Sequence, residues 1–125
     1  NMLFFDGSYV FVFNGELRGV RIPADGRIGA EKVFNYIKRF DKGDMVTAIR
    51  KGMDVIVRRP RYVRAMNMII ADSENVFLGT VYNENPGYFR LRTCQTAAGF
   101  IVSSETVVEG REWRVVPNNT VEQLR

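Results

Sequence analysis

The pair Asn14-Gly15 is the part of the sequence whose residue types could do chemistry, because it places two N–H donors side by side. The asparagine side chain carries an N–H₂ donor, and glycine leaves its own backbone N–H open to close approach. The pair directly follows the apolar run Tyr9–Phe13, and donors held at the end of a buried strand can stabilise negative charge developing on a substrate oxygen. Asn-Gly is also the strongest short signal for a tight hairpin turn, and on the residues alone this structural interpretation stays open.

The other groups that such chemistry needs are scarce in this chain. It contains no histidine, so it cannot build a Ser-His-Asp or Cys-His hydrolase by itself, and the usual zinc sites lose their commonest ligand. We expect neither a metal nor a cofactor. Cys94 is internal, and Ser103-Ser104-Glu105 has no histidine or nearby lysine to activate a hydroxyl, so we interpret both as structural. A chain-terminal amine acting as base for its own nucleophile remains available as a mechanism, although Asn1 has no nucleophilic side chain.

Composition describes one globular domain. The 125 residues are 46% hydrophobic and 26% charged, with a formal net charge of +4. The single cysteine excludes an internal disulfide, and with no secretory signal it indicates a cytoplasmic location. No apolar run is long enough to span a membrane.

Hydrophobic periodicity predicts the elements that must position Asn14 and Gly15. The run Tyr9–Phe13 reads as a strand buried on both faces, and apolar spacings of three and four predict two helices, over Gly29–Phe40 and from a cap at Asp44 to about Ile56. The remainder reads as β-rich. Its predicted strands are Ala65–Ala71, Val76–Tyr82, Tyr88–Thr93, Gly99–Val102, Trp113–Pro117 and Thr120–Arg125.

A basic cluster made of Arg58, Arg59, Arg61 and Arg64 follows the second predicted helix. Its functional interpretation is a phosphate or nucleic-acid contact with Tyr62 as a stacking platform. We favour a solvated connector between helix and strand, because Pro60 disrupts any regular display of the arginines.

The segment Phe11–Leu17 resembles the "FVHNGEL" segment of class II glutamine amidotransferases, which are N-terminal-nucleophile (Ntn) hydrolases. Three later segments resemble the family in the same order: Asn67–Asp72, Ile101–Glu105 and Trp113–Asn119. The resemblance implies an α+β fold, the four-layer αββα sandwich of antiparallel sheets. It also implies that residues 1–125 are the C-terminal two thirds of a glutamine amidotransferase type 2-like domain.

The resemblance further implies hydrolysis of the glutamine side-chain amide to glutamate and ammonia through a cysteine thioester. Asn14 and Gly15 would form the oxyanion hole, and the cysteine would come from a missing N-terminal segment or a partner chain, in a homo- or hetero-oligomer. Phe13 stands where the family has His, and Gly29 stands where it has an Asp that binds the glutamine amino group, which Asp25 would replace only if its loop folded inward. A catalytically inactive relative that serves as a partner-binding or regulatory module therefore remains the alternative.

Overall fold

The structure is a computed structural model and describes residues 2–18, 29–58, 62–105 and 111–125. Its elements in chain order are β1 (Met2–Phe5), β2 (Val10–Arg18), α1 (Gly29–Lys38), α2 (Met45–Arg58), β3 (Tyr62–Ala71), β4 (Val76–Tyr82), α3 (Pro86–Phe89), β5 (Arg92–Thr96), β6 (Gly99–Ser103), β7 (Arg114–Val115) and β8 (Thr120–Leu124).

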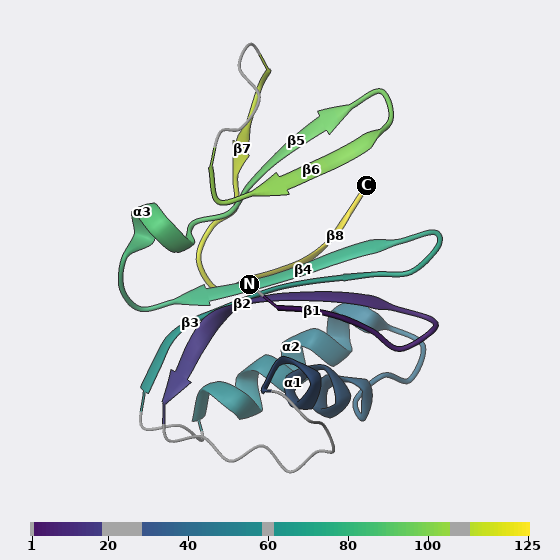
Figure 1. The fold of residues 1–125 in the computed structure, drawn as a ribbon, viewed down its shortest axis with the longest axis vertical. Helices are drawn as coiled ribbons and strands as arrows, with labels where there is room; N and C mark the ends of the chain where they lie inside the picture. Colours follow the sequence, from purple (N-terminus) through teal and green to yellow (C-terminus); the bar gives the residue numbers. More distant parts are fainter. Residues whose placement is uncertain (1, 19–28, 59–61, 106–110) are drawn as a thin grey trace.

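Two antiparallel sheets organise these elements. The larger sheet has the strand order β1-β2-β3-β4-β8, and the smaller has the order β6-β5-β7. Helices α1 and α2 cover one face of the larger sheet, and the smaller sheet stands on the other side (Figure 1). The described residues thus hold one helical layer and two sheet layers, and they confirm the predicted α+β class with antiparallel sheets.

Alternation along β2 decides which side chains face the helices. Phe11 and Phe13 are buried in the main core with Phe34 and Ile37 of α1. The alternate residues Val10 and Val12 point to the opposite face, where Val10 is 37% exposed. The prediction that Tyr9–Phe13 is buried on both faces is therefore wrong for the described residues, because only the helical layer covers this strand closely.

The helices follow the predicted periodicity. The buried face of α2 comprises Met45, Ala48, Ile49, Gly52, Met53 and Ile56. Asp44 caps this helix, since its carboxylate accepts the Thr47 backbone N–H at 3.3 Å. At Gly52 the two helices approach closely, because a Cβ there would lie 2.7 Å from Cγ1 of Ile37.

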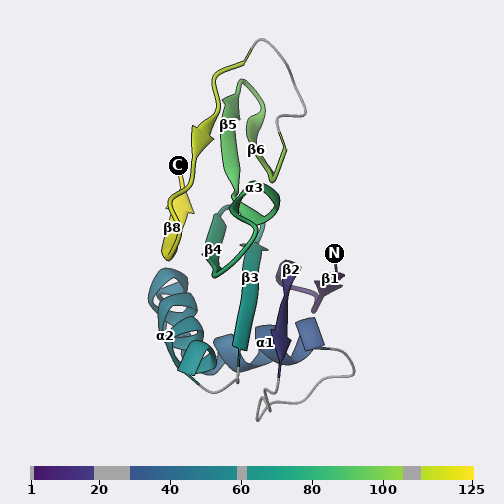
Figure 2. The same ribbon diagram turned by 90° about the vertical axis from the view of Figure 1, so that its left-hand side faces the viewer.

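The two sheets contact each other through a second, smaller core. Leu78 and Leu124 of the larger sheet meet Leu91 and Val116, which flank strands of the smaller sheet. Figure 2 shows β5 and β6 above β4, whereas β1 lies to the side, at the far end of the larger sheet. The smaller sheet therefore packs on the β4 and β8 side, and the β1-β2 hairpin projects beyond it.

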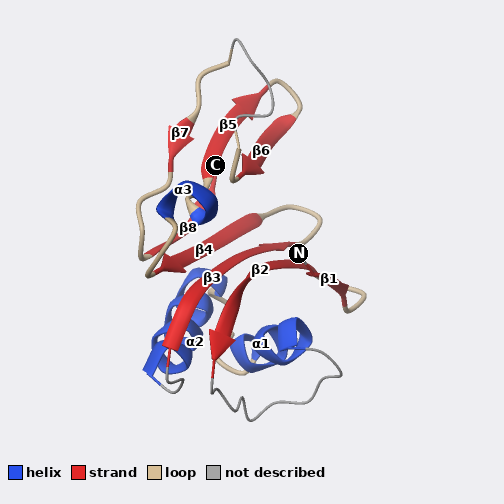
Figure 3. Ribbon diagram, turned by 60° about the vertical axis from the view of Figure 1, so that its left-hand side comes forward, coloured by secondary structure: helices blue, strands red, loops and turns tan. Residues whose placement is uncertain are grey.

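One predicted strand is wrong. The alternation over residues 88–93 predicts a strand, but Tyr88 and Phe89 belong to helix α3, and strand β5 begins only at Arg92. The cause is local: Asn85 adopts the left-handed conformation before α3, and Pro86 occupies the first helical position. This short helix sits at the junction between the two sheets (Figure 3).

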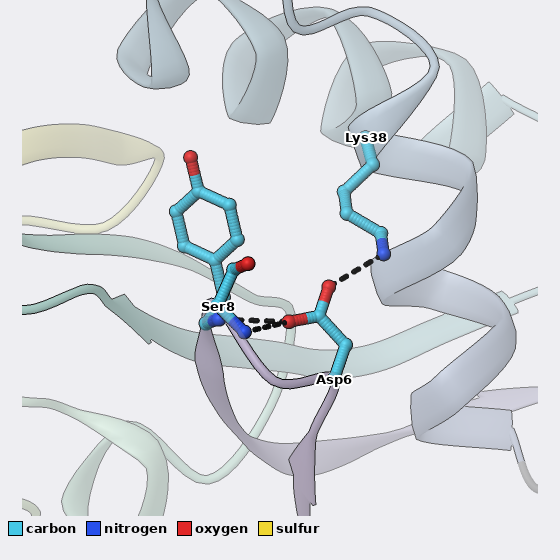
Figure 4. Close-up of polar contacts among 4 residues, drawn as sticks. Asp6, Ser8 and Lys38 are labelled. Atoms are coloured by element: carbon cyan, nitrogen blue, oxygen red, sulfur yellow. Dashed lines mark hydrogen bonds and ion pairs between the residues drawn. The ribbon is translucent and has the colours of Figure 1, made fainter.

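Asp6 fixes the β1-β2 hairpin to α1. Its Oδ1 accepts the backbone N–H groups of Ser8 at 2.9 Å and Tyr9 at 2.7 Å, and its Oδ2 accepts Nζ of Lys38 at 2.7 Å (Figure 4). Burial acts to raise the pKa of Asp6, but these hydrogen bonds to the charged form outweigh it, so the pKa lies below its ordinary value. The folded state therefore binds this proton more weakly than the unfolded state does.

We expect Asp6→Asn to destabilise the fold by about 1–2 kcal/mol at pH 7, because the charge-assisted bond to Lys38 is lost. A lowered folded-state pKa gives stability that is present above the unfolded-state pKa of about 4 and disappears as the pH falls through the folded-state value. The difference in unfolding free energy between parent and variant should therefore shrink below pH 4 in urea titrations. Asp54→Asn, a change at an exposed position on α2, is the control. A cost for Asp6→Asn that is the same at pH 7 and pH 3 would contradict the assignment.

Candidate functional site

A cavity of about 390 Å³ lies between the two sheets, on the face of the larger sheet that is turned away from the helices. Its lining combines apolar side chains with amides and hydroxyls, and none of these residues is charged. They are Leu3, Val12, Asn14, Asn67, Met68, Ile69, Leu91, Val102, Ser103 and Ser104.

Asn14 lies within strand β2 and not in a turn. The strand runs from Val10 to Arg18, and Asn14 pairs with Asn67 of β3. The hairpin interpretation of Asn14-Gly15 is therefore wrong, because β3 continues the hydrogen-bonded ladder past both residues. Alternation turns Asn14 away from the helical core and into the cavity, and its side chain makes no hydrogen bond to any described residue. Its amide is thus available to a ligand.

Gly15 has a structural reason to be glycine. A Cβ at this position would lie 2.3 Å from the carbonyl oxygen of Ala65, 2.9 Å from the carbon of that carbonyl and 3.0 Å from Cα of Met66. All three atoms belong to the backbone of β3, so no rotation of a side chain could relieve the contact. The close approach of β2 and β3 beside Asn14 therefore depends on Gly15, just before the register shifts between Glu16 and Leu17.

We expect Gly15→Ala to destabilise the fold by about 3 kcal/mol, since β2 and β3 must separate to admit the methyl group. Urea unfolding followed by circular dichroism measures the change. Gly87→Ala is the matched control, because a Cβ at Gly87 meets nothing within 4 Å. A Gly15→Ala variant as stable as the Gly87→Ala variant would show that the two strands tolerate a wider spacing.

A buried polar network extends from the cavity floor behind Asn14. Asn67 is 3% exposed, its Nδ2 donates to the backbone carbonyl of Phe89 at 2.6 Å, and its Oδ1 accepts the hydroxyl of Thr80. Asn14, Asn67, Thr80 and Thr120 occupy matching positions on β2, β3, β4 and β8. Sequence analysis did not select Asn67 as a site residue, although an amide inside the apolar strand Ala65–Ala71 was the available signal.

The two residues that differ from the family pattern, Phe13 and Gly29, lie in different parts of the fold. Phe13 is buried against Phe11 and the helices, so the side chain that stands in place of the family's histidine does not line the cavity. Gly29 is the first residue of α1. Asp25 lies outside the described residues. The structure therefore places Asn14 in the cavity lining, with Gly15 next to it in β2 but not among the lining residues, and it does not test the two candidates for the glutamine-binding loop.

The Ser103-Ser104-Glu105 segment ends strand β6 at the cavity rim. The Ser103 hydroxyl accepts the backbone N–H of Glu105 at 3.0 Å, and the backbone carbonyl of Ser104 accepts Nη1 of Arg92 at 2.8 Å. These contacts agree with the structural interpretation, since the hydroxyl of Ser103 satisfies the backbone. Cys94 is buried in β5, as predicted for a structural thiol.

The basic cluster lies away from the cavity. Arg58 ends α2, while Arg59 and Arg61 lie outside the described residues. Arg64 is engaged within the fold, because its Nε donates to Glu84 at 2.7 Å and its guanidinium lies over the ring of Phe89 at 5.4 Å. Arg64, one of the four arginines of the basic cluster, thus has a structural role, which weakens the nucleic-acid interpretation. Within the described part of the chain, no helix has the length and apolar character needed to cross a membrane.

A larger groove, of about 820 Å³, lies between the smaller sheet and β8. It contains none of the residues selected from the sequence as catalytic. Two of its arginines have partners inside the chain, since Arg114 pairs with Glu122 and Arg125 donates to Gln123 at 3.2 Å. The smaller cavity at Asn14 is therefore the better candidate site.

Known proteins resemble this chain in fold but not detectably in sequence. No protein-family model matches the chain, and no curated protein matches its sequence. Among solved structures, a glutamine aminotransferase class-II domain protein from Silicibacter pomeroyi superposes with a TM-score of 0.75 at 15% identity, over 98% of this chain and 66% of that one. A predicted glutamine amidotransferase from Pseudomonas aeruginosa gives a TM-score of 0.62 at 14% identity, over 98% and 61% of the two chains.

A third structure extends the likeness to a larger enzyme. It is the glutamine phosphoribosylpyrophosphate amidotransferase of B. subtilis, with a TM-score of 0.64 and 16% identity over 99% of this chain and 31% of that one. The chain thus spans less than two thirds of the length of each of these proteins. At these identities the likeness concerns the fold alone. The chain has the fold of class II, Ntn-type glutamine amidotransferase domains.

Proposed function

We propose that this chain is the greater part of a glutamine amidotransferase-like domain, which hydrolyses the side-chain amide of glutamine to glutamate and ammonia. A cysteine thiolate, supplied by an N-terminal segment or by a partner chain, attacks the carboxamide carbon and forms a tetrahedral intermediate. Collapse of this intermediate releases ammonia and leaves a thioester, which water then hydrolyses.

The observation that carries the proposal is the position of Asn14. Its amide lines the cavity and makes no hydrogen bond to any described residue, so it can donate to the oxygen on which negative charge develops. The Gly15 backbone N–H is the second donor of the proposed oxyanion hole. The tight contact of Gly15 with β3 supports this role, because donors stabilise a transition state best when the backbone holds them in place.

The β1-β2 hairpin offers a surface for the segment that carries the cysteine. Leu3 and Phe5 are 69% and 60% exposed, and with Val10 they form an apolar strip beside the cavity, on the same face of the sheet as Asn14. A strip of this kind on an edge hairpin favours association with another strand-forming segment. We therefore propose that the domain is completed there, within one chain or between chains of an oligomer.

The alternative is a relative without the chemistry, which keeps the fold and binds partners. Gly29 favours it, since a glycine offers no carboxylate for the glutamine ammonium group. Phe13 does not favour it, because that residue faces the core and not the cavity. The uncharged lining of the described cavity means that the amino-acid end of glutamine would need partners from elsewhere.

Intact mass spectrometry of the native material, followed by a glutaminase assay with a cysteine-directed glutamine analogue, tests the proposal. A segment with an N-terminal cysteine that accompanies this chain and becomes labelled by the analogue is the expected result. If that segment is absent, or if it stays unlabelled while glutamine is not consumed, the alternative holds: the chain keeps the fold but does not hydrolyse glutamine.

A further inference from the structure

We propose that Asn67 is a second amide donor of the cavity, and that it binds the carbonyl oxygen of a carboxamide ligand together with Asn14. This inference rests on the cavity of the proposed function, but not on a cysteine or on any chemical step.

The orientation of the Asn67 amide is fixed by its neighbours. The backbone carbonyl of Phe89 only accepts hydrogen bonds, so the atom 2.6 Å from it must be the nitrogen Nδ2. The hydroxyl of Thr80, a fully buried residue, then donates to Oδ1 on the other side of the amide. Because both ends are held, the amide cannot turn over without breaking two buried hydrogen bonds.

One Asn67 hydrogen remains unused. Nδ2 carries two hydrogens, and within the described residues it donates one hydrogen bond, to the backbone carbonyl of Phe89. Asn67 is 3% exposed, yet it lines the cavity. The Nδ2 atom already has one partner in Phe89, and its second hydrogen can be accepted by a ligand oxygen that enters the cavity. The donor is already oriented and needs no rearrangement.

Asn14 and Asn67 are suitably placed to share one ligand. They are direct cross-strand partners in β2 and β3, which places their Cβ atoms about 5 Å apart on the same face of the sheet. A carbonyl oxygen has two lone pairs and can accept from both amides at once. Asn14 can turn its amide to the ligand, whereas Asn67 supplies a fixed reference direction.

The rest of the cavity favours a neutral ligand group. Its described lining contains no cation to pair with a carboxylate, and burying an unpaired charge is unfavourable. Apolar contacts come from Val12, Ile69 and Val102, which suit the short methylene chain beside a carboxamide. The site is therefore one for a primary carboxamide, such as the side chain of glutamine or a simple aliphatic amide.

The test is a titration of native ¹⁵N-labelled protein, with any accompanying segment, using glutamine and butyramide as probes. We expect the side-chain amide signals of Asn67 and Asn14 to shift together and to saturate at the same ligand concentration.

Asn67→Asp, which keeps the shape but removes the donor, should weaken binding at least 10-fold. Asn118→Asp is the matched control and should leave the affinity within twofold. The Asn118 amide is likewise held at both ends by hydrogen bonds, in its case to the backbone N–H and carbonyl of Tyr82, but it does not line the cavity.

The outcomes separate this inference from the proposed function. If either probe shifts the Asn67 amide signal saturably in protein that does not hydrolyse glutamine, that result would support the inference about Asn67 and contradict the proposed hydrolysis of glutamine. Hydrolysis of glutamine with an unmoved Asn67 signal, or with an unimpaired Asn67→Asp variant, would overturn the inference alone. If Asn67→Asp fails to fold, the titration of the unaltered protein decides, and the absence of any saturable shift of Asn67 overturns the inference.

Discussion

Replacing Asn14 with alanine is expected to lower kcat for glutamine hydrolysis by about 10²–10³-fold in the completed protein, with a smaller change in KM. The side chain lines the cavity and is uncommitted among the described residues, so its donor acts on the ligand and not on the fold. Loss of one oxyanion donor costs about 3–4 kcal/mol of transition-state stabilisation, which is the origin of this estimate. Steady-state ammonia release measures it.

Val12→Ala is the control for Asn14→Ala. Val12 lines the same cavity from the same strand but has no donor, so its truncation should change kcat less than 10-fold and act mainly through KM. Asn14→Asp keeps the size and replaces the donor with a charge that repels an oxyanion, so its loss should be at least as large as that of Asn14→Ala. Equal losses for Val12→Ala and Asn14→Ala would mean that the shape of the cavity, and not a donor at position 14, governs the rate.

Phe34→Ala is expected to have the largest effect on stability, about 3–5 kcal/mol. The ring of Phe34 is fully buried and stacks on the ring of Phe11, with 5.0 Å between centroids. Its other ring contacts are edge-on, with Phe4 at 5.9 Å and Tyr9 at 6.0 Å. Truncation therefore leaves a cavity at the place where α1 meets both strands of the first hairpin. A cost of this size is a large share of the stability of an ordinary domain.

Urea unfolding with a fluorescence readout measures the cost of Phe34→Ala. Phe40→Ala is the control, because Phe40 is only partly buried and contacts the ring of Tyr36 at 5.4 Å. It should cost less than half as much as Phe34→Ala. A Phe34→Ala variant within 1.5 kcal/mol of the parent, a threshold set below the usual range for such truncations, would mean that the neighbouring rings collapse into the space.

The helices and most strands were predictable from the sequence, because their signals are local. Spacings of three and four residues define α2, and a side-chain cap at Asp44 marks its beginning. Runs of β-branched and aromatic residues predict the strands β3 and β4, with a turn between them. Asp72 stabilises this turn, because its carboxylate accepts the backbone N–H groups of Glu74 and Asn75. Such features need no knowledge of distant parts of the chain.

Two local signals misled because distant contacts decide the outcome. Asn14-Gly15 carries the dipeptide of a hairpin turn, but pairing with Asn67 and Met66 holds it within a strand. The alternation over residues 88–93 suggests a strand, yet the conformation at Asn85 and the following proline start α3 instead. In each case the local propensity is weaker than the tertiary or turn geometry that competes with it.

The candidate site was predictable only in part. Asn14 and Gly15 were found through their donor groups and through the resemblance of their segment, and the structure places Asn14 at a cavity. Asn67 was missed because its importance lies in the register between β2 and β3, which a single sequence does not state. The clearest sign of Asn67 in the sequence is a polar amide within an otherwise apolar strand. A buried amide needs hydrogen-bond partners, and those of Asn67 are Thr80 and Phe89.

Holding Asn14-Gly15 in an extended strand also has a consequence for the chemical ageing of the protein. In a mobile loop, the glycine nitrogen of an Asn-Gly pair attacks the carboxamide carbon of the asparagine side chain and displaces ammonia. Water then opens the resulting succinimide to aspartate or isoaspartate. This attack needs a backbone conformation that the pairing of β2 with β3 does not permit. The strand that presents the Asn14 amide to the cavity thus also protects it from deamidation, which would turn a donor into a negative charge at the point where an oxyanion is expected to form.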